Sequence, residues 1–518
     1  MEARAAAPDK LVIHSPASGA FVGEVPISSP DDVRAAVARA RVAQAEWAKR
    51  SIAQRCEVLR DVRAAVLARA DEIVDICARE NGKPRQEGLL HEVMAPLELL
   101  TYFTEEAERI LAPQPIPMHL LKHRASYLHY APRGVVGLIG PWNFPHNIPF
   151  GGAAMALLAG NAAVIKPSEF TPLVAQTVHR IWMDAGVPRD LVQVVYGYGD
   201  VGAALIGEVD MIEFTGSVAT GRKVAVACAE RLIPCVLELG GKAPALVLHD
   251  ANVERALHAV TWGGLANAGQ VCASVERLLV HEKVYDALVP RLVEKVKALR
   301  TGDAAAGADI DVGPLVNERQ RDIVERLVND ALRKGAKAAC GGKRVDGPGL
   351  FYEPTVLVDV TPDMDIVNKE TFGPVIPVMK MGDEEAMIAE ANRSHLGLLA
   401  YVFTKDGARG QRVAERIRAG TVMVNDVIAS HAMAETPWGG VKQSGIGHTH
   451  SDEGLRHMCE ARHVNYDLLP WLHRELWWYP YASKDVERFK KALALLFGRG
   501  VGERIRLLKG TPGSPPRA

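Results

Sequence analysis

The stretch Gly134-Val-Val-Gly-Leu-Ile-Gly-Pro-Trp-Asn-Phe-Pro145 decides the fold class. Its first half is an apolar run bounded by glycine, which predicts a short strand that is buried on both faces. The polar residue Asn143 follows at the carboxyl end of that strand. In open α/β sheets, ligands bind at this end of the strands. The stretch therefore predicts a parallel sheet with a ligand site at its edge.

Further strands and helices alternate along the chain. Short apolar runs predict strands at residues 162–166, 191–196, 211–214 and 235–239. Apolar residues at helical spacing predict helices at residues 29–78, 151–159, 171–185, 201–206 and 217–230. Such repeated units favour a parallel sheet covered by helices. A second alternating series, from about residue 245 to the glycine-rich segment 439–447, predicts a second α/β domain.

The composition is that of a soluble globular protein with a large core, because 48% of the 518 residues are apolar and 24% are charged. Lys and Arg number 61 and Asp and Glu number 62, which gives a net charge of −1. This balance argues against binding of nucleic acid or a membrane surface by the chain as a whole. The 46 glycines and 31 prolines are too few for a low-complexity protein.

The 7 cysteines are scattered and form no CxxC pair or Cys/His cluster at zinc spacing. We therefore expect neither a disulfide framework nor a metal site. Residues 1–13 include Glu2 and Asp9 and no apolar stretch, unlike a signal peptide. The longest apolar run, Phe150–Gly160, is too short to span a bilayer. These features predict a cytoplasmic protein.

Polar side chains follow the first two strands of the predicted sheet. The amide of Asn143 is suited to hydrogen bonding a developing oxyanion, or alternatively to stabilising the turn beside Pro145. Lys166 and Glu169 follow the next strand, where they could bracket the two hydroxyls of a ribose. An acidic residue after such a strand is typical of NAD recognition. The alternative is a solvated ion pair that contributes little to stability.

The segment Phe214-Thr-Gly-Ser217 ends a predicted strand and opens a helix. Its glycine permits close approach of the backbone, and Ser217 is placed to bind a phosphate at the helix N-terminus. The nearby turn Gly197-Tyr-Gly199 is a fragment of the dinucleotide-binding glycine pattern.

A cysteine and a glutamate are candidates for covalent catalysis. Cys272 follows a polar turn that contains glycine, and Glu238 ends a predicted strand before Gly240 and Gly241. A lone cysteine in a cytosolic protein is more often an inert buried residue. A thiolate nucleophile with a separate carboxylate base would instead let a thioester form and then be hydrolysed.

Over nearly its whole length, residues 28–467, the chain resembles the NAD(P)-dependent aldehyde dehydrogenase superfamily. Seven motifs in order carry the resemblance: Pro141-Trp-Asn-Phe-Pro145, Gly160-Asn-Ala-Ala-Val-Ile-Lys-Pro-Ser-Glu169, Phe214-Thr-Gly-Ser217, Glu238-Leu-Gly-Gly-Lys242, Gly269-Gln-Val-Cys272, Glu370-Thr-Phe-Gly-Pro374 and Pro437-Trp-Gly-Gly-Val-Lys-Gln-Ser-Gly445.

The resemblance implies the role of each matching residue. Cys272 would attack the aldehyde carbon, Asn143 and the Cys272 N–H would hold the oxyanion, and Glu238 would activate the water that releases the carboxylic acid. The cofactor, NAD with NADP as the alternative, would be bound by Trp142, Lys166, Ser168, Glu169, Gly199, Ser217, Glu370 and Phe372.

The resemblance also implies a Rossmann-like cofactor domain, an α/β catalytic domain and a small β extension that pairs subunits into dimers or tetramers. We expect the cofactor domain at residues 10–113 and 133–240 and the catalytic domain at residues 241–442. The oligomerisation extension is expected at residues 114–132 and 459–470.

Two departures from the family pattern concern the substrate and the proton path. Hydrolytic members often carry a relay lysine where this chain has Gly152, whereas Glu435 matches a second relay carboxylate. Gly151 stands where members specific for succinate semialdehyde carry a carboxylate-binding arginine. These glycines favour medium- or long-chain or aromatic aldehydes. The segments Ala273-Ser-Val-Glu-Arg277 and His395-Leu-Gly-Leu398 resemble succinate-semialdehyde members, so that substrate stays an alternative. A CoA-acylating enzyme is a further alternative, disfavoured by Glu238.

The C-terminal segment, residues 471–518, is not required by the family core. It contains 10 Lys or Arg and 4 acidic residues, a net charge of +6. Val486, Phe489, Leu493 and Leu496 recur at helical spacing after an aromatic cluster, Trp477-Trp-Tyr-Pro-Tyr481. Such a basic amphipathic helix is suited to a membrane interface. The alternative is that it packs on the body or on a neighbouring subunit.

Overall fold

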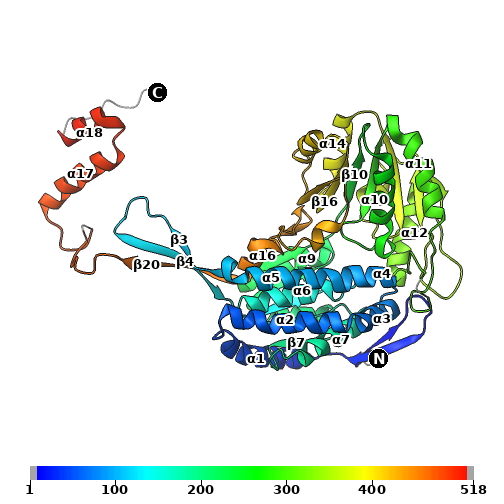
Figure 1. Ribbon diagram of the computed structural model, residues 1–518, viewed down its shortest axis with the longest axis horizontal. Helices are drawn as coiled ribbons and strands as arrows, with labels where there is room; N and C mark the ends of the chain where they lie inside the picture. Colours follow the sequence, from blue (N-terminus) through cyan, green and yellow to red (C-terminus); the bar gives the residue numbers. More distant parts are fainter. Residues whose placement is uncertain (1–8, 308, 476, 510–518) are drawn as a thin grey trace, which may run out of the picture. The chain divides into compact units, whose positions relative to one another are not determined.

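The computed structural model describes residues 9–307, 309–475 and 477–509. The chain divides into two compact units (Figure 1). The first contains residues up to 112 and 129–462, and the second contains residues 113–128 and those from 463 onward.

The N-terminal half of the first unit is built on a sheet of strand order β19-β9-β8-β5-β6-β7. The strands from β9 to β7 run parallel, and β19 is antiparallel to β9. Their bounds are β5 (Val135–Ile139), β6 (Ala162–Lys166), β7 (Val192–Val194), β8 (Met211–Thr215), β9 (Cys235–Glu238) and β19 (Gly445–Ile446). The predicted parallel sheet is therefore confirmed, and β6 spans the predicted residues.

Helices cover this sheet. α6 and α1 pack against β5 and β6, α1 also contacts β7, α8 packs against β5, and α9 packs against β8 and β9. The helices are α1 (Pro30–Trp47), α2 (Ile52–Ala68), α3 (Ala70–Glu80), α4 (Arg85–Gly88), the π-helical η1 (Leu89–Met94), α5 (Ala95–Leu111), α6 (Asn147–Leu158), α7 (Pro172–Asp184), α8 (Gly199–Ile206) and α9 (Val218–Arg231). The predicted helical region 29–78 is divided into three helices. The Ser51 hydroxyl accepts a hydrogen bond from the Gln54 N–H and so starts α2.

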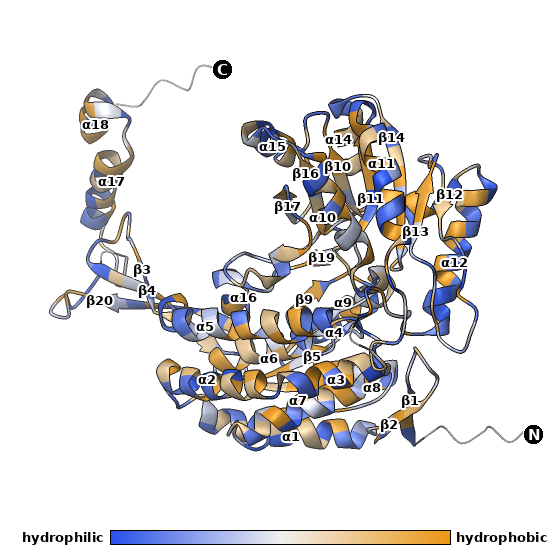
Figure 2. Cartoon of the chain, turned by 45° about the vertical axis from the view of Figure 1, so that its right-hand side comes forward, coloured by the Kyte–Doolittle hydropathy of each residue, from blue (hydrophilic) through white to orange (hydrophobic). Residues whose placement is uncertain are grey.

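A second, mostly parallel sheet follows, with strand order β12-β13-β14-β11-β10-β16-β17. Its strands are β10 (Ala243–Val247), β11 (Val275–His281), β12 (Lys337–Cys340), β13 (Thr355–Val358), β14 (Val375–Met381), β16 (Leu399–Phe403) and β17 (Thr421–Val424). The associated helices are α10 (Val253–Leu265), η2 (Ala266–Gly269), α11 (Glu282–Lys297), α12 (Glu318–Arg333), α13 (Asp365–Asn368), α14 (Glu384–Arg393) and α15 (Gly407–Ala414). Two later helices pack against helices of the first sheet instead: η3 (Ala429–Ala432) against α5, and α16 (Ser451–His457) against α5 and α6. Hydrophobic residues are concentrated in the strands of the second sheet (Figure 2).

Two short ladders complete the first unit. Strands β1 (Lys10–His14) and β2 (Phe21–Pro26) form an antiparallel hairpin, and β15 (Leu396–Gly397) pairs with β18 (Val441–Lys442).

The second unit contains much of a sheet of order β20-β4-β3, built from β3 (Gln114–Ile116), β4 (Arg124–Pro132) and β20 (Cys459–Asp467). The helices α17 (Ser483–Phe497) and α18 (Gly500–Leu508) follow. The predicted amphipathic helix thus corresponds to α17. The last part of the predicted extension, residues 510–518, lies outside the described residues.

The fold places the predicted chemical groups at the ends of strands. Asn143 follows β5, Ser217 follows β8, and Glu238 is the last residue of β9. The chain crosses from β9 to β10 of the second sheet within a few residues. Cys272 precedes β11, next to β10 in that sheet. The two sheets therefore bring these side chains from distant parts of the sequence to their junction.

Candidate active site

The turn before Cys272 has an unusual backbone. Asn267, Ala268 and Gly269 have φ values of 51°, 55° and 71°, all in the left-handed region. A Cβ at Gly269 would collide with the Gly373 carbonyl oxygen. Such strain persists only where surrounding contacts hold it. Here the Asn267 N–H donates to Glu87 Oε2 at 2.7 Å, and the Gln270 side chain accepts from the Val316 N–H at 2.9 Å.

Asn143 is fixed to the same turn. Its Nδ2 donates to the Gln270 carbonyl oxygen at 2.9 Å, and its side chain is buried. The Asn143 carbonyl oxygen accepts from Lys83 Nζ at 2.8 Å. Lys83 forms a fully buried ion pair with Glu92. The amide of Asn143 is therefore held beside the Cys272 turn, and one of its two N–H groups is already engaged.

Glu238 approaches Cys272 from the first sheet. The glycines that follow Glu238 let the two segments come close, because a Cβ on Gly241 would collide with the Cys272 carbonyl oxygen. Glu238 is 5% exposed, and within the described residues only the Trp438 side chain offers its carboxyl group a hydrogen bond. A buried carboxyl group with so few partners is costly to ionise.

The electrostatics of these groups follow from their burial. Burial, with the neighbouring Glu238 and Glu370, raises the pKa of the Cys272 thiol to about 12. Burial also raises the pKa of Glu238 well above its usual range, and the nearby Glu213 adds to this effect. The resting thiol is therefore protonated at neutral pH and needs a base for its ionisation.

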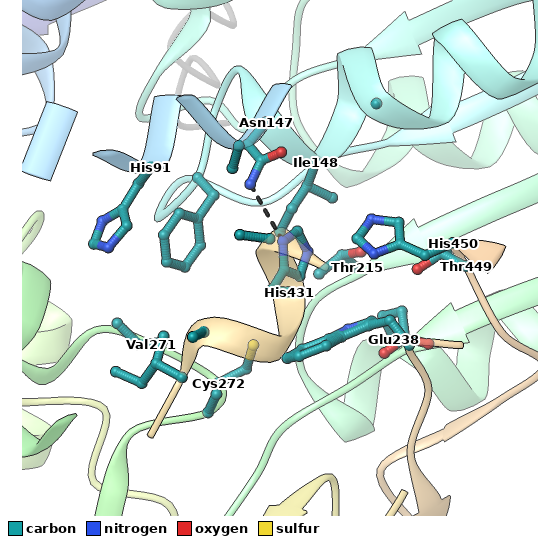
Figure 3. A pocket seen from close by; sticks show the side chains of 18 of the residues that line it. His91, Asn147, Ile148, Thr215, Glu238, Val271, Cys272, His431, Thr449 and His450 are labelled. Carbon is teal, nitrogen blue, oxygen red and sulfur yellow. Dashed lines mark hydrogen bonds between the residues drawn. The ribbon is translucent and has the colours of Figure 1, made fainter. Parts of the chain in front are cut away.

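An apolar cavity lies on one side of Cys272 and Glu238 (Figure 3). It encloses about 1020 Å³, counting its open mouth. Its wall is mostly aliphatic or aromatic and includes Leu90, Met94, Phe144, Ile148, Met155, Trp262, Val271, Ile428 and Trp438. Figure 3 shows His91, His431 and His450 around the same space. Burial lowers the pKa of each of these histidines, so they are neutral at pH 7.

An open cleft of about 1560 Å³, counting open space, lies on the other side. Of the predicted cofactor-binding residues, Trp142, Glu169, Ser217, Glu370 and Phe372 line this cleft. Cys272 and Glu238 line both the apolar cavity and the open cleft, and Asn143 lines the cleft. The three predicted catalytic residues therefore share the open cleft, and Cys272 and Glu238 also face the apolar cavity.

Hydrogen bonds and one ring contact fix the walls of the cleft. Glu370 Oε1 accepts from the Gly241 N–H at 2.9 Å. The Phe372 ring lies edge-on to Trp142, with 5.3 Å between ring centroids. The Phe372 N–H donates to Glu276 Oε1 at 2.8 Å. Ser217 caps α9, and its Oγ accepts from the Thr220 N–H at 3.2 Å.

Three of the predicted cofactor-binding residues lie outside the described lining of the cleft: Lys166, Ser168 and Gly199. Lys166 is buried, and its Nζ donates to the Pro167 carbonyl oxygen at 2.7 Å and lies 3.9 Å from Glu169 Oε2. Burial lowers the pKa of Lys166. Gly199 is the first residue of α8. This helix passes close to Lys166, because a Cβ on Gly202 would lie 3.7 Å from Lys166 Cδ.

Sequence reasoning missed several groups at the site. The Lys83–Glu92 ion pair belongs to no recognisable motif, although Lys83 donates a hydrogen bond to the Asn143 carbonyl oxygen. Glu213 lines the apolar cavity from β8, whereas the predicted relay residue Glu435 is exposed and is not among the described lining residues. A signal for Glu213 existed, since it is a carboxylate inside an otherwise apolar strand. Among the described residues, no group of three or more His, Cys, Asp or Glu could hold a metal ion.

The doubly wound sheet and the adjoining α/β domain, with a cysteine at their junction, define an α/β enzyme with two connected substrate spaces. The model of the aldehyde dehydrogenase family matches residues 3–464. The 4,4'-diapolycopene aldehyde oxidase of Methylomonas sp. is 36% identical over 493 residues, which cover 93% of this chain and 91% of that protein. A Mycobacterium ulcerans protein provisionally named succinate-semialdehyde dehydrogenase (NADP+) 2 is 37% identical over 443 residues, 85% of each chain.

The same relationship is found among solved structures. The NAD+ complex of aldehyde dehydrogenase from Bacillus cereus matches with a TM-score of 0.85 and 34% identity, over 89% of this chain and 93% of that chain. The chain belongs to the aldehyde dehydrogenase family. It is thus an NAD(P)-dependent oxidoreductase that acts on aldehyde groups. The predicted family, fold class and enzyme class are confirmed.

Proposed function

We propose that this enzyme oxidises an apolar aldehyde to a carboxylic acid through a thiohemiacetal and then a thioester on Cys272. The observation that carries this proposal is the position of Cys272 and Glu238 at the junction of the apolar cavity and the open cleft. A carbonyl carbon bound there would be in reach of a nucleophile, a base and an amide donor.

In this mechanism the Cys272 thiol gives its proton to a base, either Glu238 or water in the open cleft. The sulfur then bonds to the aldehyde carbon, so that the carbonyl oxygen becomes an oxyanion. The remaining N–H of the Asn143 amide and the Cys272 backbone N–H stabilise that charge. When bound, NAD or NADP supplies the hydride acceptor that this oxidation requires. Glu238 then takes a proton from water, the oxygen adds to the thioester carbon, and the carbon–sulfur bond breaks.

The open cleft has a donor set that fits a dinucleotide. The N-terminus of α9 with the Ser217 hydroxyl suits a pyrophosphate. Glu169, with Lys166 behind it, suits ribose hydroxyls, and the paired rings of Trp142 and Phe372 line the same cleft near Cys272. Together with Glu370, Ser168 and Gly199, these are the residues that we propose to hold the cofactor. We assign cofactor binding to residues 10–113 and 133–240 and the nucleophile to residues 241–442.

We expect NAD to be preferred over NADP. The Glu169 carboxylate accepts hydrogen bonds from ribose hydroxyls and repels a 2′-phosphate, and such like-charge contacts cost up to several kcal/mol. Glu169→Ala is expected to raise the kcat/KM ratio of NADP to NAD by about tenfold or more, because Lys166 and Lys223 would remain. Initial rates with both cofactors test this. A wild-type enzyme that favours NADP would contradict the prediction.

The substrate class follows from the charges around the apolar cavity. No Lys or Arg is among its described lining residues, whereas the buried acids Glu213 and Glu238 are. A substrate carboxylate would therefore find no cation and would face two carboxyl groups. Gly151 lies in this wall where an arginine would be needed. This environment supports medium- or long-chain or aromatic aldehydes.

We expect kcat/KM to rise from butanal to octanal by about fourfold per methylene, the equivalent of ~0.8 kcal/mol, until the cavity is full. The measurement is NADH absorbance with a series of straight-chain aldehydes, with benzaldehyde and succinate semialdehyde as comparisons. The second candidate, succinate-semialdehyde oxidation, is favoured by the names of the mycobacterial relatives. A kcat/KM for succinate semialdehyde far above that for octanal would select it.

The second unit supports a proposal about partners and location. Within the described residues, no helix is long and apolar enough to cross a bilayer. Along α17, however, Val486, Phe489, Leu493 and Leu496 are each more than 40% exposed. Basic side chains lie between them. Figure 2 shows that both hydrophobic and hydrophilic residues occur along this helix. We propose that this face binds an anionic membrane surface, and that residues 114–132 and 459–470 pair subunits into an oligomer.

Flotation with vesicles of phosphatidylcholine and phosphatidylglycerol tests the membrane proposal. The full chain is expected to float, and a chain ending at Pro470 is expected to stay in solution with its activity retained. Leu493→Ser with Leu496→Ser is the finer variant, since both side chains are about half exposed in the full chain. Aggregation or loss of the oligomer in the double variant would instead show that this face packs on protein.

A further inference from the structure

Glu213 and Glu238 lie on neighbouring parallel strands of the first sheet. In the register of β8 with β9, Glu213 is opposite Val236, and Thr215 is opposite Glu238. Side chains two residues apart on a strand point to the same face. The two glutamates are therefore diagonal neighbours on one face of the sheet, and both line the apolar cavity.

Gly152 leaves the space that the Glu213 carboxyl group uses. A Cβ at this position of α6 would lie only 2.6 Å from Glu213 Oε1 and 2.9 Å from Leu138 Cδ2. Any side chain at residue 152 would thus displace the Glu213 carboxyl group. Residue 152 is a glycine in this chain, and the Glu213 carboxyl group lies against it.

Glu213 has no ordinary structural role in this position. It is 5% exposed, and its Oε2 has no hydrogen-bond partner within the described residues. No Lys or Arg among the described lining residues offers an ion pair. A buried carboxyl group without a partner is destabilising. Such groups are found at functional sites, where their effect on a neighbour is used.

Other titratable groups also face Glu213 and Glu238. Cys272 approaches from the turn before β11, and Glu370 lies beside Gly240. His91, His431 and His450 line the cavity, and burial lowers the pKa of each, so that they carry no charge near neutral pH. Burial raises the pKa of Glu213 to about 8. The charge of Glu213 in turn adds to the effect of burial on the pKa of Glu238.

We propose that Glu213 is a positioning residue: its carboxyl group lies beside Glu238 on the same face of the sheet and the same cavity wall, where it disfavours a second negative charge, so that Glu238 acts as a base only at higher pH. This inference rests on the proposed function. Once ionised, Glu238 takes a proton from water while the water oxygen bonds to the acyl carbon and the carbon–sulfur bond breaks. Glu238 returns that proton to the departing sulfur, which restores the thiol and the carboxylate.

The test is the pH dependence of kcat for Glu213→Gln, which keeps the shape of the neutral side chain. Removing a like charge lowers the pKa of Glu238, so the acid limb of the profile should move to lower pH by about one unit. Glu213→Asp keeps a carboxyl group, and its midpoint should lie closer to that of the wild type. Glu230→Gln, on the exposed surface of α9, is the matched control and should not move the midpoint.

The pre-steady-state burst of NADH separates this inference from the proposed function. If Glu213→Gln folds, gives a full burst and keeps the wild-type midpoint, the role of Glu213 is overturned while the thioester mechanism stands. If the wild-type enzyme forms no NADH with octanal, or if Cys272→Ala forms NADH at the wild-type rate, the proposed function itself fails. A normal burst in Glu213→Gln with a midpoint shifted to lower pH supports both.

Discussion

Replacing Cys272 with alanine is expected to abolish aldehyde oxidation, with a loss in kcat of about 10⁴-fold or more, as for other covalent nucleophiles. The thiol forms the only covalent bond between enzyme and substrate in the proposed mechanism. None of the other cysteines, which all lie within the described residues, lines the apolar cavity or the open cleft. Binding of NAD should persist, because most of the cleft wall is untouched. NADH absorbance and calorimetric titration with NAD measure the two effects.

Cys235→Ala is the matched control for this prediction. The hydrogen bond with Cys228 lowers the pKa of Cys235, so by acidity alone Cys235 is the more reactive thiol. It begins β9, at the opposite end of that strand from Glu238. If position rather than acidity selects the nucleophile, Cys235→Ala keeps wild-type turnover. Turnover that survives in Cys272→Ala and disappears in Cys235→Ala would contradict the assignment.

The strands that could be predicted are those whose pattern of apolar residues lies within one short segment of the sequence. β5 and β6 are apolar runs between glycine and polar residues, and such runs are typical of buried parallel strands. β11 was not predicted, because Glu276 and Arg277 within it look like surface residues. Both are buried, Glu276 against Lys242 Nζ at 2.6 Å and Arg277 against the Ala391 carbonyl oxygen at 3.0 Å. Partners that are distant in sequence satisfy these charges, and no local pattern reveals them.

At the candidate site, too, the local motifs could be predicted, whereas the contacts between residues distant in sequence could not. Asn143, Glu238 and Cys272 were predicted from their motifs, and all three side chains line the open cleft. The loop that carries Asn143 is held by Lys83, a contact across 60 residues of sequence that no motif records. The pairing of Glu213 with the space above Gly152 is also nonlocal. The sequence predicts functional residues whose motif lies within one segment. It does not predict the buried neighbours of these residues, because they come from other parts of the chain.

Replacing Glu238 with glutamine is expected to leave the first half of the reaction and stop the second. Without the carboxylate, water is not activated, and removal of a general base lowers the rate of such a step by about 10²–10⁴-fold. The enzyme should therefore release one equivalent of NADH per active site and then stall as a thioester on Cys272. Rapid-mixing absorbance measures the burst, and intact mass spectrometry of the stalled protein detects the acyl group.

The rate of the NADH burst distinguishes between two possible roles of Glu238, as the base for hydrolysis only or also as the base that deprotonates Cys272. Because burial keeps the Cys272 thiol protonated at neutral pH, a base is needed before attack as well as before hydrolysis. If Glu238 serves only in hydrolysis, Glu238→Gln gives a burst at the wild-type rate. If it also deprotonates Cys272, the burst keeps its amplitude but becomes slower, and raising the pH restores its rate. Multiple turnovers at the wild-type rate would exclude Glu238 from both steps. Glu230→Gln, a carboxylate removed from the exposed face of α9, should follow the wild-type course throughout.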